Sequence, residues 1–227
     1  MNQRKILILT SAHLCRNPRV VKEATTLGAA GYDVTVMSVS SQARFERMDR
    51  ELMRGLPFQR VVIDYTASTP GARLADFLQR GATWVARRVC SELEFETAQT
   101  LGPARALLRF ARRFPADLTI VHTEIPIWAA QHLIKDGRRV AVDVEDWYSE
   151  DLLFADRRSR PLRMLRHAEQ AALRQASYSS ATAQSMADAL TNAYQCPPPI
   201  VLRNSFPLQP RSRVDFPATT GTPRFIW

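Results

Sequence analysis

The first forty residues alternate between strand-like and helix-like patterns of apolar positions. A continuous apolar run at residues 5–10 has the length of a central strand. Asn17 and Pro18 then provide an N-cap and a first helical residue, and apolar residues recur over the next three turns with helical spacing. Gly31 follows as a helix-ending glycine, and the alternating segment 33–39 predicts a second strand. The chain therefore opens with a strand, a helix and a strand.

The middle of the chain changes from strand to helix. After the second strand, a polar linker that contains methionine leads to a third strand at 60–65 and a turn-rich break at 66–71. Residues 73–114 then have a helical pattern, and the part at 102–114 is the most clearly amphipathic. One of its faces consists of Leu107, Leu108, Ala111 and Phe114, and the other carries Arg105, Arg109, Arg112 and Arg113.

Residues 117–151 predict a second strand, helix and strand unit. The apolar runs 118–121 and 140–142 are short enough to be buried strands, and 127–134 between them has helical spacing. In a parallel sheet the residues just past the strand ends share one edge, where open α/β sheets bind ligands. We therefore expect the polar residues of these two tips to cluster there, namely His122, Glu124, Glu145, Asp146 and Glu150.

The last part of the chain predicts one more helical pair and then a linker. A helix at 165–175, a weak strand at 177–181, a helix at 183–194 capped by Thr182 and a buried strand at 200–202 follow one another. These elements complete an α/β domain over residues 1–205, a Rossmann-like parallel sheet flanked by helices. Residues 206–223 are rich in proline and predict an extended interdomain linker, and 224–227 resemble the first strand of a further, missing domain.

Composition narrows the class of protein. The 227 residues are 45% hydrophobic and 23% charged, as in an ordinary globular protein. No run approaches the roughly 20 apolar residues that span a bilayer, so we expect a cytoplasmic protein. The three cysteines are isolated in the sequence, which suggests neither a disulfide framework nor a zinc site.

The net charge of +9 favours anionic partners. Arginines opposite leucine and phenylalanine at 102–114 suit a helix lying on an anionic membrane, which would make the protein peripheral on the inner face of the plasma membrane. The alternative is a helix packed on the sheet with a solvated basic face. Nucleic-acid binding has only the net charge behind it, because no recognised motif accompanies it, and we expect no nucleic-acid partner.

Arg19 is the first candidate for ligand binding. The loop after the first strand contains no glycine and no G-x-G-x-x-G, which argues against a nicotinamide dinucleotide. Arg19 lies in the first turn of the predicted helix, where positive charge is unfavourable against the helix dipole unless an anion offsets it. A ligand phosphate or carboxylate would do so, whereas a merely solvated arginine is the alternative.

Four motifs together resemble the N-terminal half of family 4 glycosyltransferases of the GT-B fold, in the expected order over residues 5–207. The opening strand and helix read KILILTSAHLCRNPRVVKEATTLGAAGYDVTV, and the fourth strand reads DLTIVHTEIP, with His122 at the second histidine of the family motif and Ile120 at the first. RVAVDVEDWYSED resembles the next motif, with Glu145 where many relatives have histidine. SYSSATAQSMADALTNAY and IVLRNSFP resemble the run that leads to the interdomain linker.

The resemblance implies half of a retaining, metal-independent enzyme. The missing half would bind the nucleotide-sugar donor, and this half would bind a glycan or lipid-linked acceptor in cell-envelope or exopolysaccharide assembly. His122 matches the family histidine that contacts the donor sugar, which makes it the catalytic candidate; a structural hydrogen-bonding role is its alternative. We expect a substrate-binding role for Arg19, Glu124, Asp146, Glu150 and Asn204.

We expect no cofactor and no metal, because adjacent carboxylates on one loop do not make the octahedral oxygen site of magnesium. The chain alone is expected to be inactive. The competing hypothesis is a non-catalytic Rossmann-like module that binds an anionic membrane or ligand.

Overall fold

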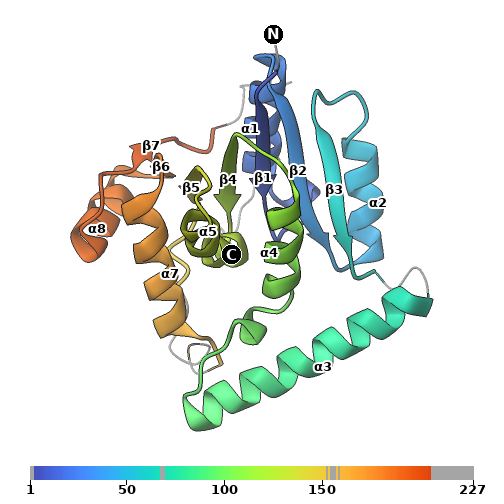
Figure 1. Cartoon of the computed structure of the whole chain (residues 1–227), viewed down its shortest axis with the longest axis vertical. Coiled ribbons are helices and arrows are strands. Elements are labelled where there is room, and N and C mark those ends of the chain that lie inside the picture. The colour runs from blue at the N-terminus through green and yellow to red at the C-terminus, as the bar shows by residue number, and fades with distance from the viewer. Residues whose placement is uncertain (1–2, 67–69, 152, 154–156, 158, 206–227) are drawn as a thin grey trace, which may run out of the picture.

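The protein is a single parallel sheet covered by helices, seen in a computed structural model that describes residues 3–66, 70–151, 153, 157 and 159–205. The sheet has seven strands in the order β3-β2-β1-β4-β5-β6-β7 (Figure 1). The strands are β1 (Lys5–Leu9), β2 (Asp33–Ser40), β3 (Gln59–Asp64), β4 (Leu118–His122), β5 (Val140–Val144), β6 (Ser179–Ala181) and β7 (Ile200–Val201). The predicted α/β, Rossmann-like class is confirmed.

The helices alternate with the strands along the chain. They are α1 (Pro18–Ala29), α2 (Ala43–Leu52), α3 (Pro70–Leu93), α4 (Ala104–Arg113), α5 (Glu124–Lys135), α7 (Leu162–Gln175) and α8 (Gln184–Tyr194), with short 3-10 turns η1 (Leu14–Arg16) and η2 (Ala98–Leu101). None of the helices in the described part of the chain is long and apolar enough to cross a membrane.

Two apolar layers follow from the alternation of side chains along β1. Ile6 and Ile8 belong to the cluster on one face, with Val20 and Ala24 of α1. Leu7 and Leu9 belong to the larger cluster on the other face, to which α4, α5, α7 and α8 contribute. Because β1 is the middle strand between β2 and β4, both of its faces are covered, which explains its continuous apolar run.

Helix α2 was missed by the sequence analysis, which predicted a linker there. Its inward face is carried by carboxylates rather than by apolar residues, so it has no apolar stripe to detect. Glu46 and Asp49 are buried and form ion pairs with Arg60 of β3 at 3.0 and 2.9 Å. His13 Nδ1 adds a contact to Asp49 at 3.1 Å, so a buried ionic cluster holds α2 in place.

Two smaller predictions near the C-terminal end are wrong. β7 is an edge strand whose Ile200 is 55% exposed, rather than a buried strand. Helix α8 has Ala183 as its N-cap residue, and the Thr182 hydroxyl lies against the sulfur of Met186 instead of capping the helix. The predicted linker at 206–223 and the strand start at 224–227 lie outside the described residues.

Asn17 and Gly31 bound α1 as predicted. The Asn17 side chain accepts a hydrogen bond from the Val20 amide, which caps the helix, and Gly31 has φ of +90° just beyond it. Within α1, Gly28 packs so closely on Pro57 that a Cβ there would lie 2.1 Å from the Pro57 carbonyl oxygen.

Gly28→Ala should therefore destabilise the protein by about 1–3 kcal/mol, because the backbone of Pro57 has to move. Gly81→Ala is the matched control, since Gly81 is also helical but has open space around its Cβ position. That change should stabilise by about 0.5–1 kcal/mol through helix propensity. Urea denaturation of both variants measures the difference, and equal effects would contradict the close contact.

Candidate functional site

The centre of the site is the point where the strand order reverses, between β1 and β4. Ser11 follows β1 and Thr123 follows β4, and their hydroxyl oxygens lie 2.7 Å apart. The Ser11 amide also donates to Thr123 Oγ1 at 3.1 Å. In open α/β sheets this switch point at the carboxyl ends of the strands is where ligands bind.

Thr123 has a strained backbone. Its φ of 66° and ψ of 165° fall in a region that is normally restricted to glycine, and it is the N-cap residue of α5. Such a conformation costs about 1–3 kcal/mol and persists only when surrounding contacts hold it. The two contacts with Ser11 are such a restraint, and they fix the direction in which the chain leaves β4.

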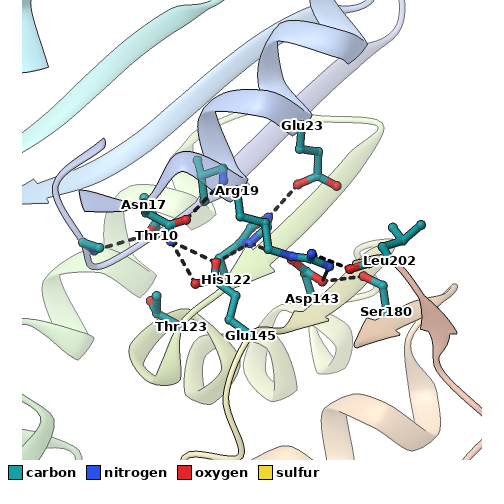
Figure 2. Close-up of polar contacts among 12 residues, drawn as sticks. Thr10, Asn17, Arg19, Glu23, His122, Thr123, Asp143, Glu145, Ser180 and Leu202 are labelled. Carbon is teal, nitrogen blue, oxygen red and sulfur yellow. Dashed lines mark hydrogen bonds and ion pairs between the residues drawn. The ribbon is translucent and has the colours of Figure 1, made fainter. Parts of the chain in front are cut away.

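His122 lies beside Thr123 at the end of β4 and is completely buried. Its Nδ1 is 2.9 Å from Glu145 Oε1 and 3.1 Å from Asp143 Oδ2, and its Nε2 is 2.6 Å from Glu23 Oε2 (Figure 2). Both ring nitrogens therefore face carboxylates. We call this group, together with Asn17, Arg19 and Ser180, the His122 cluster.

Arg19 makes the second cationic contact of the cluster. Its guanidinium forms a bidentate pair with Asp143, in which Nη2 lies 2.7 Å from Oδ1 and Nε contacts Oδ2. Its Nη1 also donates to the Leu202 carbonyl at 2.6 Å. The negative charge that balances Arg19 near the N-terminus of α1 is thus the carboxylate of Asp143. Binding of a ligand anion by Arg19 stays a prediction.

Asn17 and Glu23 connect α1 to the strand ends. The Asn17 amide nitrogen donates to Glu145 at 2.9 Å while its oxygen caps α1, and Glu23 reaches His122 from the second turn of the helix. Ser180 of β6 donates to Asp143 at 2.6 Å. The cluster therefore ties α1, β4, β5 and β6 into one polar unit under the sheet edge (Figure 2).

The charges in the cluster shift the pKa values of His122 and Asp143 in opposite directions. Burial alone would lower the pKa of His122, but Asp143, Glu145 and Glu23 outweigh it and raise that pKa well above 6.5. Burial alone would raise the pKa of Asp143, but Arg19, His122 and Ser180 outweigh it and lower that pKa below 3.8. At neutral pH His122 is therefore an imidazolium among carboxylates.

This state limits what His122 can do in a reaction. A buried imidazolium with both nitrogens engaged has no free lone pair with which to act as a base, and it has no exposed surface for a substrate. Contact with a donor sugar requires Glu23, which is partly exposed, to leave Nε2. The catalytic role of His122 stays a prediction, whereas its role in holding the strand ends together is what the geometry shows.

Two groups of donor atoms in the described residues have the composition of a metal site. One consists of His122, Asp143 and Glu145, and the other of His13, Glu46 and Asp49. In each group an arginine already occupies the carboxylates: Arg19 pairs with Asp143, and Arg60 bridges Glu46 and Asp49. The guanidinium groups supply the positive charge that a cation would bring.

A cleft of about 530 Å³ lies next to the cluster, between the strand ends and α3. We call it the α3 cleft. Residues that follow four successive strands of the sheet line it, and the facing side of α3 contributes polar groups. The first set is Ser11, Ser41, Tyr65 and Glu124, and the second includes Asp76, Gln79, Arg80, Thr83 and Arg87.

The structure brings together only part of the predicted acidic cluster. His122 and Glu145 are in contact, but Glu124 faces the α3 cleft and forms an ion pair with Arg160. Glu150 binds Arg166, with 2.8 Å between Oε1 and Nε, and Asp146 is exposed. The expectation that all five carboxylate and imidazole groups share one cluster is wrong, because the tip after β5 is long enough to turn Glu150 toward α7.

Asn204 lies in a second cavity, of about 340 Å³, where the chain leaves β7 and passes α1. Its side-chain oxygen accepts a hydrogen bond from Lys22 Nζ at 2.7 Å, and Lys22 also donates to the Ser205 carbonyl. Arg19 and Arg203 line the same cavity. Substrate binding by Asn204, Asp146, Glu150 and Glu124 stays a prediction.

The arginines of α4 are exposed, as expected for either reading of that helix. Arg105, Arg109, Arg112 and Arg113 all point to solvent, while Leu107, Leu108 and Ala111 are buried in the core. Arg112 forms a bidentate ion pair with Asp136, with 2.7 Å between Nε and Oδ2. The apolar face of α4 is therefore used for packing, and contact with a membrane is left to its arginines.

Sequence reasoning missed Glu23 and Ser180 as members of the His122 cluster. Glu23 is not among the residues singled out from the sequence, and Ser180 lies in a strand that is weak by composition. A usable signal existed for Glu23, because it lies four residues after Arg19 on the helix that packs above the predicted central strands.

Protonation of His122 predicts how stability depends on pH. The folded state keeps a proton that the unfolded chain releases near pH 6.5, so this stabilisation is complete below that pH and is lost as pH rises toward the folded pKa. The free energy of unfolding should fall by up to about 1.4 kcal/mol per pH unit above pH 6.5. Urea denaturation across this range measures the slope.

Glu23→Gln should shorten the pH range over which stability falls, because losing one of the carboxylates that hold the proton lowers the folded pKa of His122. Glu51→Gln on the exposed side of α2 is the control and should leave the pH profile unchanged. Identical profiles in wild type and Glu23→Gln would show that Glu23 does not stabilise the imidazolium.

The strain at Thr123 predicts an inverted order of two substitutions. Both Thr123→Gly and Thr123→Ala lose the contacts with Ser11, but only glycine accepts φ of 66° without strain. The glycine variant should be the more stable by about 1 kcal/mol. At Thr119, within β4 and without positive φ, alanine should be the better replacement. Thermal or urea denaturation measures the stability of all four variants. If the alanine variant is the more stable one at both positions, Thr123 is not strained.

No family model and no curated protein sequence matches the chain. Among solved structures, Arabidopsis thaliana UGT89C1 complexed with UDP-L-rhamnose is 11% identical, with 93% of this chain and 54% of that chain covered and a TM-score of 0.48. LpCGTa in complex with UDP is 12% identical, with 85% and 49% covered and a TM-score of 0.49. A putative UDP-N-acetylglucosamine 2-epimerase from Listeria monocytogenes is also 12% identical, with 85% and 43% covered and a TM-score of 0.41.

The chain thus spans about half the length of these structures. The Rossmann-like fold follows from the strand order of the sheet itself.

Proposed function

We propose that the chain is the acceptor-binding half of a retaining glycosyltransferase, which transfers a sugar from a nucleotide-sugar donor to a glycan or lipid-linked acceptor. The observation that carries the proposal is the α3 cleft, which lies over the carboxyl ends of β1 to β4 at the switch point of the sheet. In this proposal the acceptor occupies the cleft, and a further domain binds the donor. The chain alone is inactive.

The lining of the cleft suits a ligand with many hydroxyl groups. Ser11, Gln79 and Thr83 offer neutral donors and acceptors, and Asp76 and Glu124 offer carboxylates that accept hydrogen bonds from hydroxyls. Each carboxylate is paired with an arginine, Asp76 with Arg80 and Glu124 with Arg160. These pairs hold the carboxylates in place, which a binding site requires.

Transfer of a sugar needs stabilisation of the departing phosphate and removal of a proton from the acceptor hydroxyl. In our proposal the cations near the exit of β7, Lys22 and Arg203, face the donor side. The acidic groups of the α3 cleft receive the acceptor, and the His122 cluster fixes the strand ends between the two cavities. Positive charge from arginine and lysine makes a metal cofactor unnecessary in this scheme.

The cleft is tested by paired substitutions on α3 and α8. Gln79→Ala with Thr83→Ala removes two polar groups of the cleft, and Gln184→Ala with Thr191→Ala changes the same residue types on α8. Binding of a panel of methyl hexopyranosides to the 227-residue chain is followed by ligand-observed NMR. The α3 pair should weaken binding about ten-fold, as expected for losing hydrogen bonds worth about 1.4 kcal/mol in total, and the α8 pair should not.

Two further measurements separate the transferase from a non-catalytic module. The reading frame downstream of codon 227 should encode a second α/β domain, and the product of the whole frame should release UDP from a UDP-hexose in the presence of acceptor. A stop codon at that point, or equal sugar binding by both paired variants, would overturn the proposal.

A further inference from the structure

Helix α3 presents its apolar side to solvent. Phe77 is 72% exposed, Trp84 69% and Leu74 60%, and Leu78 and Val85 are exposed beside them. These positions share one face at helical spacing, which we call the outer face of α3. An exposed, contiguous set of large apolar side chains marks an interaction site rather than an ordinary surface.

The opposite side of α3 is polar and turned toward the protein. Asp76, Gln79 and Thr83 lie on it and line the α3 cleft, and Cys90 is buried near its end. The amphipathic pattern of the helix is thus reversed relative to a helix packed on a core. Figure 1 shows α3 as a long helix that runs apart from the sheet and its covering helices.

Arginines flank the outer face. Arg73, Arg80 and Arg87 recur every seven residues along one margin, and Arg88 projects within the face itself. Helix α3 contains four arginines against Asp76 and Glu92, so it keeps a net positive charge even where Arg80 and Arg88 form ion pairs along the helix. A partner for this surface must combine an apolar layer with negative charge.

We propose that the outer face of α3 docks on an anionic lipid surface. Phe77, Trp84 and Leu78 would enter the boundary between headgroups and acyl chains, and the flanking arginines would meet the lipid phosphates. Aromatic and leucine residues on one face with arginine at its margin are the combination that holds a helix in the plane of a membrane.

The membrane contact therefore moves from α4, where the sequence analysis placed it, to α3. The leucines of α4 are buried, whereas α3 offers both the apolar layer and the charge.

Docking in this way would place one margin of the α3 cleft beside the lipid surface. Trp84 and Arg87 line the cleft and also border the outer face. This step rests on the proposed transferase function: an acceptor that is linked to lipid would reach the cleft from the membrane, so we favour it over a free glycan. Membrane docking itself does not depend on the activity.

Vesicle co-sedimentation tests the docking with the 227-residue chain. The probes are vesicles of phosphatidylcholine alone and of phosphatidylcholine with phosphatidylglycerol, each at low and high salt. Wild type should pellet with the anionic vesicles, less so at high salt, and remain in solution with the neutral ones. Phe77→Gln with Trp84→Gln should reduce the partition coefficient at least about ten-fold, and glutamine preserves helix propensity.

Met48→Gln with Leu52→Gln is the control, because these side chains are also exposed apolar residues of a helix, α2. It should bind vesicles like wild type. Circular dichroism of the variant with both Phe77→Gln and Trp84→Gln should confirm an unchanged helix content. Because the chain has four tryptophans, a blue shift of fluorescence on vesicle binding supports insertion of Trp84 only where Trp84→Phe removes it.

Three outcomes would overturn the proposal. They are no binding of wild type to anionic vesicles, equal binding to neutral vesicles, and equal binding by the Phe77 and Trp84 variant. Concentration-dependent dimerisation that this variant abolishes, without lipid binding, would assign the face to a second copy of the chain. If wild type binds anionic vesicles but none of the methyl hexopyranosides, the result counts against the proposed transferase and leaves the membrane docking standing.

Discussion

The buried imidazolium of His122 is the interaction on which the rest of the site depends. It is surrounded by Asp143, Glu145 and Glu23, which come from two strand ends and from α1. Removing the cation would leave three carboxylates sharing Arg19, and an uncompensated buried charge is strongly destabilising. The position of α1 over the sheet, and the start of α5 after β4, are thus fixed by charge as much as by apolar packing.

Arg19 extends this constraint to the place where the chain leaves the sheet. Its guanidinium joins Asp143 to the Leu202 carbonyl, and Lys22 holds Asn204 and Ser205 one turn further along α1. A single helix therefore sets both the strand ends and the direction of the exit after β7. A buried network of this kind adds little net stability over an apolar core, but it admits only one arrangement of its parts.

Apolar periodicity predicted the order of the strands along the chain and most helices, because β1, β4 and β5 are buried on both faces and α1, α4 and α5 each carry an apolar stripe. Apolar periodicity did not predict α2, because its inward residues Glu46 and Asp49 are charged. They are buried only because Arg60 of β3 pairs with both of them. The partners of His122 were hidden for the same reason. Glu23 is 99 positions away, and nothing in the local sequence indicates that the two side chains meet.

Helix α3 shows a different limit of sequence reasoning. The pattern of Leu74, Phe77 and Leu78 predicts a helix with one apolar face, but periodicity does not say toward what that face is turned. In the structure the polar side of α3, with Gln79 and Thr83, faces the strand ends and lines the α3 cleft. The apolar side therefore points to solvent. The cleft and the exposed face are therefore two consequences of one orientation of the helix, and the exposed apolar side is the surface that we propose docks on lipid.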